Sequence, residues 1–415
     1  MERIRLRIPD EQIDWRATGF WWPGRPIAVS EFAARRPHLF GGAFTWPIMV
    51  LRRSKLERNI AALAEFTAAH GLTFAPHGKT SMAPVLFQAQ LDAGAWGLTA
   101  ATANQVLAYR RFGMPRVLLA NELLDATALR WIAAELDRDP DFEFLCYADS
   151  PAGVEVAAGA VARRPGGRPL RMLVERGFPG GRTGCRTEDQ VMEVARAVAA
   201  APGLELAGVA GYEGGLATGD AVRDFVRGLA GDAARLGAEG LVAAPPILSV
   251  GGSSWFDVVA EELADRGDLR VVLRSGAYVA HDDGLYHRNS PFRRAGGAED
   301  DLAGALEIWA QISSVPEPGL AIATMGRREA NSDAGPPVPR VLRRPDGEQA
   351  DLSGAEVTAL NDHHAYLSLP AGVRVAPGDL VGFGISHPCT AFDRWRLIPV
   401  VADDDTVVDV LRTYF

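Results

Sequence analysis

The sequence predicts an α/β fold, a closed (β/α)8 barrel of the TIM type joined to an antiparallel β domain. From residue 47 to about residue 295, eight short apolar runs alternate with stretches of helical period. Runs that are almost continuously apolar are typical of parallel strands buried on both faces. After about residue 300 the helical period fades and short alternating runs follow, which predicts the β domain. An open doubly wound sheet would produce the same alternation and stays an alternative.

The barrel strands are expected at eight runs of buried character. These runs are Leu72–Pro76, Trp96–Thr99, Val117–Ala120, Phe142–Tyr147, Leu170–Glu175, Leu204–Tyr212, Ile247–Val250 and Val271–Arg274. Helices are expected between them, for example over Ala101–Phe112 and Asp220–Leu236. Thr187 and Gln190 form the pattern of a capping box at the start of another helix, whose apolar positions then recur with helical spacing.

Residues 1–46, which are irregular and rich in Trp and Pro, are assigned with residues 296–415 to the β domain. Its expected strands are Val357–Leu360, Ala365–Leu369, Leu380–Ile385, Arg396–Val401 and Val407–Leu411. Turn signals at residues 345–347 and 403–405 separate some of them. The stretch Gly326–Pro339, rich in small residues, Pro and Arg, is a candidate exposed loop or lid.

The composition excludes several classes of protein. A net charge of -9 and a pI near 5.5 argue against a nucleic-acid partner, whose phosphates would repel the chain. No apolar run approaches the roughly 20 residues that span a bilayer, and the charged N-terminus lacks the apolar core of a secretory signal. Three cysteines form a sparse, odd set that predicts reduced thiols and a cytoplasmic location.

Lys79 is the first candidate for chemistry, because it follows the first expected strand. Functional residues of parallel barrels lie at the carboxyl ends of the strands. A lysine there can form an imine if burial and neighbours lower its pKa. A surface lysine capping a loop is the plainer interpretation. His77 precedes it by two residues, in Pro76-His77-Gly78-Lys79-Thr80.

Two small-residue turns after the last two strands predict an anion site. In the first, Ser249–Ser254, paired glycines let backbone N–H groups approach a phosphate at a helix N-terminus. The second, Arg274–Tyr278, adds Gly276 and a phenol. Barrels often bind phosphate after strands seven and eight. An imine lysine opposite a phosphate site is what pyridoxal phosphate requires, although two ordinary tight turns would look alike.

Near the C-terminus, His387 and Cys389 stand two residues apart in an extended segment, so both can project to one side. Imidazole and thiolate together suit Zn²⁺, and a catalytic zinc can leave coordination positions open. A buried cysteine beside a histidine is the simpler alternative for so short a motif. His363 and His364 are a second candidate, or only a polar turn between strands.

The segments around Lys79, Ser249–Ser254, Arg274–Tyr278 and Ser386–Cys389 resemble the D-serine dehydratase and D-threonine aldolase family. These are fold-type III pyridoxal-phosphate enzymes related to alanine racemase. The resemblance runs from about residue 46 to residue 415. The lysine and His-Pro-Cys segments are its specific parts.

The resemblance implies roles for individual residues. Lys79 would be the Schiff-base lysine, Tyr212 would lie near the ring and substrate, and Arg182 would contact the ring. His77 is included as a cofactor contact, and the pair that would bind Zn²⁺ or another divalent metal is His387 and Cys389. The residues that would hold the phosphate are Gly251, Gly252, Ser253, Gly276 and Tyr278.

The resemblance implies a lyase acting on a small D-amino acid such as D-serine, D-threonine or D-threo-3-hydroxyaspartate. The aldolases tend to carry aspartate where Cys389 stands, so the cysteine favours a dehydratase that releases a 2-oxo acid and ammonia. A retro-aldol lyase, a racemase and a non-catalytic cofactor-binding protein are the alternatives. A homodimer is expected by analogy. Gly78, where relatives more often have a bulkier residue, and Glu175–Phe178 depart from the pattern.

Overall fold

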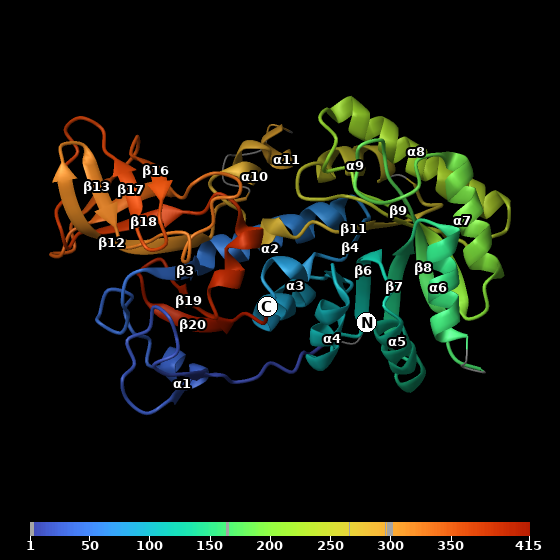
Figure 1. Cartoon of the computed structure of the whole chain (residues 1–415), viewed down its shortest axis with the longest axis horizontal. Helices are drawn as coiled ribbons and strands as arrows, with labels where there is room; N and C mark the ends of the chain where they lie inside the picture. Colours follow the sequence, from blue (N-terminus) through green and yellow to red (C-terminus); the bar gives the residue numbers. More distant parts are fainter. Residues whose placement is uncertain (1–3, 163–165, 265, 295, 297–301) are drawn as a thin grey trace. The chain divides into compact units, whose positions relative to one another are not determined.

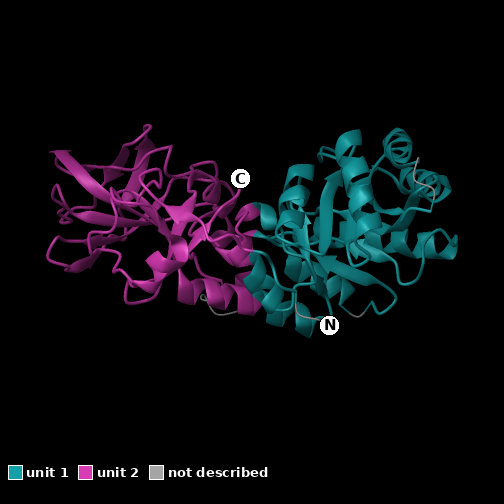
Figure 2. Ribbon diagram, turned by 90° about the horizontal axis from the view of Figure 1, so that it is seen from below, with its two compact units in different colours: residues 1–7, 63–79, 87–276 teal, residues 8–62, 80–86, 277–415 magenta. Residues whose placement is uncertain are grey.

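The computed structural model describes residues 4–162, 166–264, 266–294, 296 and 302–415. Figure 1 draws the chain with its elements labelled, and Figure 2 colours its two compact units. The described residues within 1–7, 63–79 and 87–276 form the first unit, and those within 8–62, 80–86 and 277–415 form the second. None of the described helices combines the length and the apolar character needed to cross a membrane.

The first unit contains a parallel sheet of eight described strands in the order β4-β11-β10-β9-β8-β7-β6-β5. Each strand coincides with a run predicted from the sequence. The strands are β4 (Thr73–Phe74), β5 (Leu98–Ala100), β6 (Arg116–Glu122), β7 (Glu143–Ala148), β8 (Leu170–Arg176), β9 (Leu204–Gly211), β10 (Ile247–Ser249) and β11 (Arg270–Leu273).

The sheet closes on itself through its two end strands, β4 and β5. The N–H of Trp96 donates to the C=O of Phe74 at 2.8 Å, and the N–H of Thr99 donates to the C=O of Pro76 at 2.9 Å. His77 and Thr99 then form a parallel bridge. The predicted closed barrel is therefore confirmed over the open doubly wound sheet.

Helices lie before the first barrel strand and between successive barrel strands, as predicted. They are α2 (Arg53–Ala69), α3 (Pro84–Asp92), α4 (Ala103–Arg111), α5 (Ala126–Arg138), α6 (Pro151–Val161), α7 (Glu188–Ala200), α8 (Gly219–Ala238) and α9 (Phe256–Leu263). Thr102, Thr187 and Thr218 each cap a helix by accepting a backbone N–H. The capping box predicted from Thr187 and Gln190 is present.

One apolar cluster fills the barrel interior. Its buried members come from or lie beside the strands: Ala75, Trp96, Leu118, Leu145, Tyr147, Leu173, Ala207, Ala210, Ile247 and Val272. Side chains of alternate positions on each strand point inward and form such packed layers in barrels. The interior is a core, so polar chemistry is confined to the strand ends.

The second unit is built on antiparallel strands in the order β15-β14-β18-β12-β13-β17-β16, with β3 pairing with β12 and β19, and β19 with β20. A separate small sheet pairs β1 with β2. The strands are β1 (Gln12–Ile13), β2 (Ile27–Ala28), β3 (Ile48–Arg52), β12 (Leu306–Glu317), β13 (Leu320–Ala323), β14 (Val338–Arg343), β15 (Gln349–Asp351), β16 (Glu356–Leu360), β17 (Ala365–Ser368), β18 (Leu380–Gly384), β19 (Leu397–Val401) and β20 (Val407–Arg412).

Short helices complete the chain. They are α1 (Val29–Ala34), α10 (Leu285–Arg288), α11 (Pro291–Arg294) and the 3-10 turns η1 (Gly78–Thr80), η2 (Ala277–Val279), η3 (Pro388–Thr390) and η4 (Phe392–Arg394). The five strand runs predicted after residue 350 correspond to β16–β20. Strands β12–β15 were not predicted.

Strand β3 lies beyond the predicted domain boundary at residue 47, yet it belongs to the antiparallel unit. Ile48–Leu51 pair with Leu306–Trp309 of β12. A buried ion-pair network strengthens this junction. Arg52 donates from Nε to Glu307 at 2.7 Å and from Nη1 to Asp405 at 2.6 Å. The apolar run of β3 alone does not reveal which sheet it joins, because central strands of either kind are apolar.

Candidate active site

Lys79 lies in the short turn η1 that follows β4, and it is half-buried. The residue before it, Gly78, faces the buried ring of Tyr109 on α4. A Cβ atom at position 78 would lie 2.5 Å from the Tyr109 hydroxyl oxygen. Burial raises the pKa of Tyr109, so the hydroxyl stays neutral. The glycine at position 78 therefore has a structural cause: Tyr109 occupies the space that a larger side chain would need.

The pKa of His77 is affected by burial and by nearby positive charges. Burial lowers its pKa well below the usual range, and the positive charges of Lys79, Arg274 and Arg182 lower it further. The imidazole is therefore neutral, and its buried Nδ1 atom has no hydrogen-bond partner within the described residues. Three cations around a neutral ring form a site that attracts an anion.

Arg274, which follows β11, is fixed in the barrel mouth. It is 4% exposed and donates from Nη1 to the Ser249 hydroxyl and from Nη2 to the C=O of Gly211, both at 2.8 Å. Its buried Nε has no partner within the described residues. The guanidinium thus ties the ends of β9, β10 and β11 together and retains one unsatisfied donor.

The predicted phosphate turn is already engaged by a buried carboxylate. Gly251 and Gly252 donate their N–H groups to Glu213 at 3.1 and 2.6 Å. The Ser275 hydroxyl donates to the C=O of Gly252 at 2.9 Å. The two glycine amides that the sequence analysis assigned to a phosphate therefore bind Glu213 in this structure. Glu213 lies far from the two glycines in sequence, so the glycine motif gave no indication of this contact.

Gly276 and Tyr278 occupy different surroundings. A Cβ atom at position 276 would lie 2.5 Å from the Cβ of His77, so the glycine permits close packing against His77. Tyr278 is buried in η2 of the second unit. Ser253 follows the glycine pair at the start of the turn that leads to α9.

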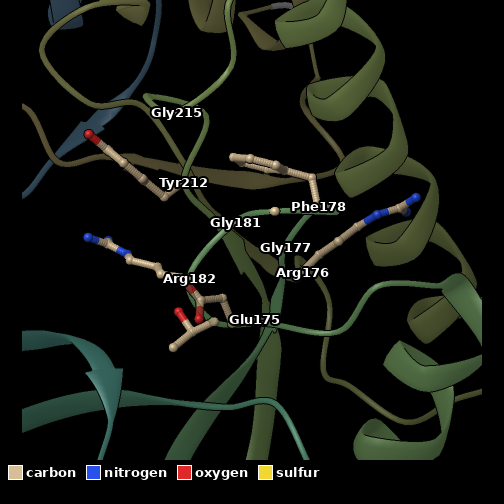
Figure 3. Close-up of a pocket in the computed structure, with 10 residues that line it drawn as sticks. Glu175, Arg176, Gly177, Phe178, Gly181, Arg182, Tyr212 and Gly215 are labelled. Carbon is tan, nitrogen blue, oxygen red and sulfur yellow. The ribbon is translucent and has the colours of Figure 1, made fainter.

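Arg182 and Tyr212 line a cavity of about 230 Å³, together with Glu175, Arg176, Phe178 and Gly215 among others. The Arg182 guanidinium lies 4.6 Å from the centre of the Tyr212 ring, and Figure 3 shows the two side chains extending to the same side. Gly252 leaves room for this ring, since a Cβ atom there would approach it to 3.0 Å. The cation–π contact orients both predicted residues.

Two carboxyl groups that the sequence motifs did not indicate lie at or near the carboxyl ends of β6 and β8, the two strands on either side of β7. Glu122 ends β6, and the buried Glu175 stands in β8. Burial, together with the hydrogen bond and the charge of Glu175, raises the pKa of Glu122 to about 8. Acidic residues at the end of apolar strands were the signal that could have identified them.

A second group of candidate residues surrounds His387 in the second unit. His387 Nδ1 lies 2.6 Å from Asp333 Oδ2. The hydrogen bond with Cys389 raises the pKa of His387 to about 9, with a further contribution from Asp333. The predicted pair of His387 and Cys389 is thus brought together, and Asp333 from the 326–339 stretch joins it.

Asp333 is held by further donors. Asn331 Nδ2 donates to its Oδ1 at 2.9 Å, and the Thr390 hydroxyl donates to the same oxygen at 2.8 Å. Burial alone would raise the pKa of Asp333, but hydrogen bonds from Asn331, His387 and Thr390 lower it to about 2. The Asp333 carboxylate is therefore ionised, and its hydrogen bonds hold it beside the His387 imidazole.

The donor set at His387 and Cys389 fits a divalent metal with open coordination positions. Because Asp333 binds at Nδ1, the Nε2 atom of His387 can carry the lone pair that a metal needs. Thiolate and imidazole are preferred ligands of Zn²⁺. Within the described residues, no group of three or more His, Cys, Asp or Glu side chains is placed to hold a metal ion. The protein would supply two ligands.

His363, the other histidine candidate, belongs to a separate cluster. Its Nδ1 lies 2.7 Å from Glu329 Oε1, and the ring is largely exposed in the turn between β16 and β17. The Glu329 Oε2 atom accepts the N–H of Gly326. The pair closes a turn and has no thiol beside it, which agrees with the polar-turn interpretation.

Comparisons with known proteins place the chain among relatives of one kind. Residues 305–401 match a family model described as "Putative serine dehydratase domain". The chain is 27% identical over 340 residues to 3-hydroxy-D-aspartate aldolase of Paracoccus denitrificans (strain Pd 1222), covering 80% of this chain and 84% of that protein.

Solved structures share the fold. D-threonine aldolase from Filomicrobium marinum aligns with a TM-score of 0.75 and 22% identity, over 89% of this chain and 95% of that one. D-threo-3-hydroxyaspartate dehydratase from Delftia sp. HT23 aligns with a TM-score of 0.71 and 21% identity, over 91% and 99%. A cysteine-to-alanine variant of such a dehydratase has been solved in a metal-free form. The chain is thus similar over most of its length to a D-amino-acid aldolase and shares its fold with D-threonine aldolase and D-threo-3-hydroxyaspartate dehydratase, in agreement with the resemblance seen in its motifs.

Proposed function

We propose that this chain is a pyridoxal-phosphate-dependent lyase that removes water from a small D-configured β-hydroxy-amino acid and releases a 2-oxo acid and ammonia. The position of Lys79 in the turn after β4, together with Arg274 fixed at the ends of β9, β10 and β11, carries the proposal. These cations suit an anionic, aromatic cofactor. The relatives named above are lyases of D-amino acids, which supports the same class here.

The residues of the barrel mouth would divide the work. Lys79 would hold the cofactor covalently, and its released Nζ would take the Cα proton from the substrate. When bound, pyridoxal phosphate supplies an electron sink for the charge left at Cα. Arg182 and Tyr212, which contact each other, would together orient the cofactor ring. The neutral His77 imidazole would pack nearby without adding a charge.

The phosphate would be held near Gly251, Gly252, Ser253, Gly276 and Tyr278. Glu213 accepts hydrogen bonds from the two glycine amides. When the phosphate binds, the carboxylate would either hold the turn in its present conformation or move aside. Arg274 supports the first interpretation, since it already fixes the strand ends on either side of this turn.

His387 and Cys389 would hold Zn²⁺ or another divalent metal. When bound, the metal supplies a Lewis acid that stabilises the departing hydroxide. The metal-free form described for a cysteine-to-alanine variant of a related dehydratase supports a metal at this thiol. Dehydration is favoured over retro-aldol cleavage because a cysteine stands at position 389, where the family's aldolases tend to have an aspartate.

Product analysis distinguishes the proposed reaction from its alternatives. The holoenzyme with zinc is incubated with D-serine, D-threonine and D-threo-3-hydroxyaspartate. A 2-oxo acid with ammonia is the expected outcome, whereas glycine with an aldehyde would mean a retro-aldol lyase. Inversion at Cα alone would mean a racemase. Bound cofactor with no product from any substrate would favour a non-catalytic cofactor-binding protein.

The homodimer and the cytoplasmic location predicted from the sequence stay proposals. Sedimentation of the holoenzyme measures the mass in solution, and the monomer mass of 44.4 kDa sets the reference. A species of twice that mass is expected.

A further inference from the structure

Neither the sequence motifs nor the relatives named above assign a role to the Asp333 carboxylate. It lies in the 326–339 stretch, 54 residues before His387 in sequence, and its side chain is 45% exposed. An aspartate this exposed is not needed to fill the core. Its Oδ2 nevertheless faces the Nδ1 atom of His387 at 2.6 Å.

The remaining lone pairs of Asp333 are also used. Oδ1 accepts from Asn331 at 2.9 Å and from Thr390 at 2.8 Å. Asn331 is 1% exposed and also donates to the C=O of His387 at 2.7 Å, so it binds the aspartate and the histidine backbone together. Thr390 is three residues after His387. The carboxylate is therefore fixed to the same short segment that carries the histidine.

This arrangement controls the imidazole ring. An acceptor at Nδ1 keeps the proton on that atom, so that Nε2 is the nitrogen that would give up its proton when a metal binds. The same acceptor fixes the rotation of the ring. Cys389, two residues after His387, forms a hydrogen bond with the same imidazole, so the thiol and the ring lie close together. Asp333 is not a third ligand, because no cluster of three such groups exists in the described part of the chain.

We propose that Asp333 is a positioning residue for the metal site: by accepting the Nδ1 proton of His387, it holds Nε2 beside the Cys389 sulfur and strengthens the binding of a divalent metal. This inference rests on the proposed metal site at His387 and Cys389. Asn331 and Thr390 act through Asp333, because they hold its carboxylate in place.

The chain contains a matched control. His363 and Glu329 form a second imidazole–carboxylate pair in the same unit, at 2.7 Å compared with 2.6 Å for His387 and Asp333. That pair has no thiol beside it. Replacing Glu329 therefore removes the same kind of contact without touching a candidate metal ligand.

The test measures metal affinity directly. Metal-free protein is titrated with Zn²⁺ against a chromophoric chelator, and Co²⁺ is used in parallel because its spectrum reports thiolate coordination. The variants are D333N, D333A, H387A, C389A and E329Q. We expect D333N and D333A to weaken Zn²⁺ binding by about 10- to 100-fold, as for other outer partners of metal-binding histidines. E329Q should bind as the wild type does.

The outcomes separate this inference from the proposed function. If H387A and C389A lose zinc but D333N and D333A bind normally, the positioning role is wrong and the metal site stands. If neither H387A nor C389A changes the affinity, the metal site itself is wrong, and the role of Asp333 falls with it. Thermal unfolding of the metal-free proteins identifies any variant that is misfolded. If one of the two variants at position 333 does not fold, the other still allows zinc affinity to be compared with the wild type.

Discussion

The Thr80 hydroxyl oxygen lies 3.5 Å from the sulfur of Cys389, within hydrogen-bonding distance. Thr80 is the residue directly after Lys79 in sequence, although the two residues that form the contact are 309 positions apart. Both residues belong to the second unit, so the contact helps to fix the Cys389 side chain within that unit.

Gly78 should tolerate no side chain while Tyr109 is present. We expect G78A to lower the free energy of unfolding by about 1–3 kcal/mol, because the new Cβ would crowd the Tyr109 hydroxyl. The double variant G78A/Y109F should recover part of the loss, since the hydroxyl is gone and the ring carbons remain. Denaturant titrations measure both. The control G159A adds a methyl group where nothing lies within 4 Å. Equal losses in G78A and in the double variant would contradict the account.

Glu213 should stabilise the glycine turn. In E213A the amides of Gly251 and Gly252 lose their acceptor, and each buried unsatisfied donor costs about 1–3 kcal/mol. We expect a lower unfolding midpoint and weaker retention of pyridoxal phosphate, followed by absorbance after dialysis. The control E239A removes a partly exposed carboxylate that pairs with Arg196. Wild-type stability and retention in E213A would show that the turn needs no carboxylate.

Glu122 should make stability depend on pH. Burial and Glu175 raise its pKa to about 8 from an ordinary value of 4.5, so the folded chain favours the protonated form. This contribution to stability is fully present below pH 4.5 and is lost as the pH rises through about 8. E122Q, which mimics the protonated carboxyl, should lose less stability than the wild type between about pH 6 and pH 9. E57Q, on an exposed surface pair, is the control. Parallel pH profiles of E122Q and the wild type would refute the assignment.

Metal removal should stop turnover of the best D-amino-acid substrate. Chelation of the holoenzyme should abolish release of the 2-oxo acid, and added Zn²⁺ should restore it, because the hydroxyl is a poor leaving group without a Lewis acid. H387A and C389A should not recover with zinc, whereas H363A should behave as the wild type does. A coupled assay of the oxo acid measures the rates. Full activity in the metal-free enzyme would exclude the Lewis-acid role.

Local sequence pattern predicted most of the barrel, because the apolar periodicity of a strand and the capping residues of a helix involve residues that are close in sequence. Long-range partners were not predictable in this way. The contacts of Gly252 with Glu213 and of His387 with Asp333 join residues 39 and 54 positions apart. Strand β12 was missed because its last five residues, 313–317, are exposed and lack the apolar signal.

The sequence contains only two lysines, Lys55 and Lys79, which makes the central claim directly testable. Borohydride reduction of the holoenzyme converts the bound cofactor and its lysine into a stable secondary amine, and peptide mass analysis then locates the label. The account predicts the label on Lys79 and none on Lys55, which pairs with Glu307. A label on Lys55, or unlabelled protein that still converts substrate, would contradict it.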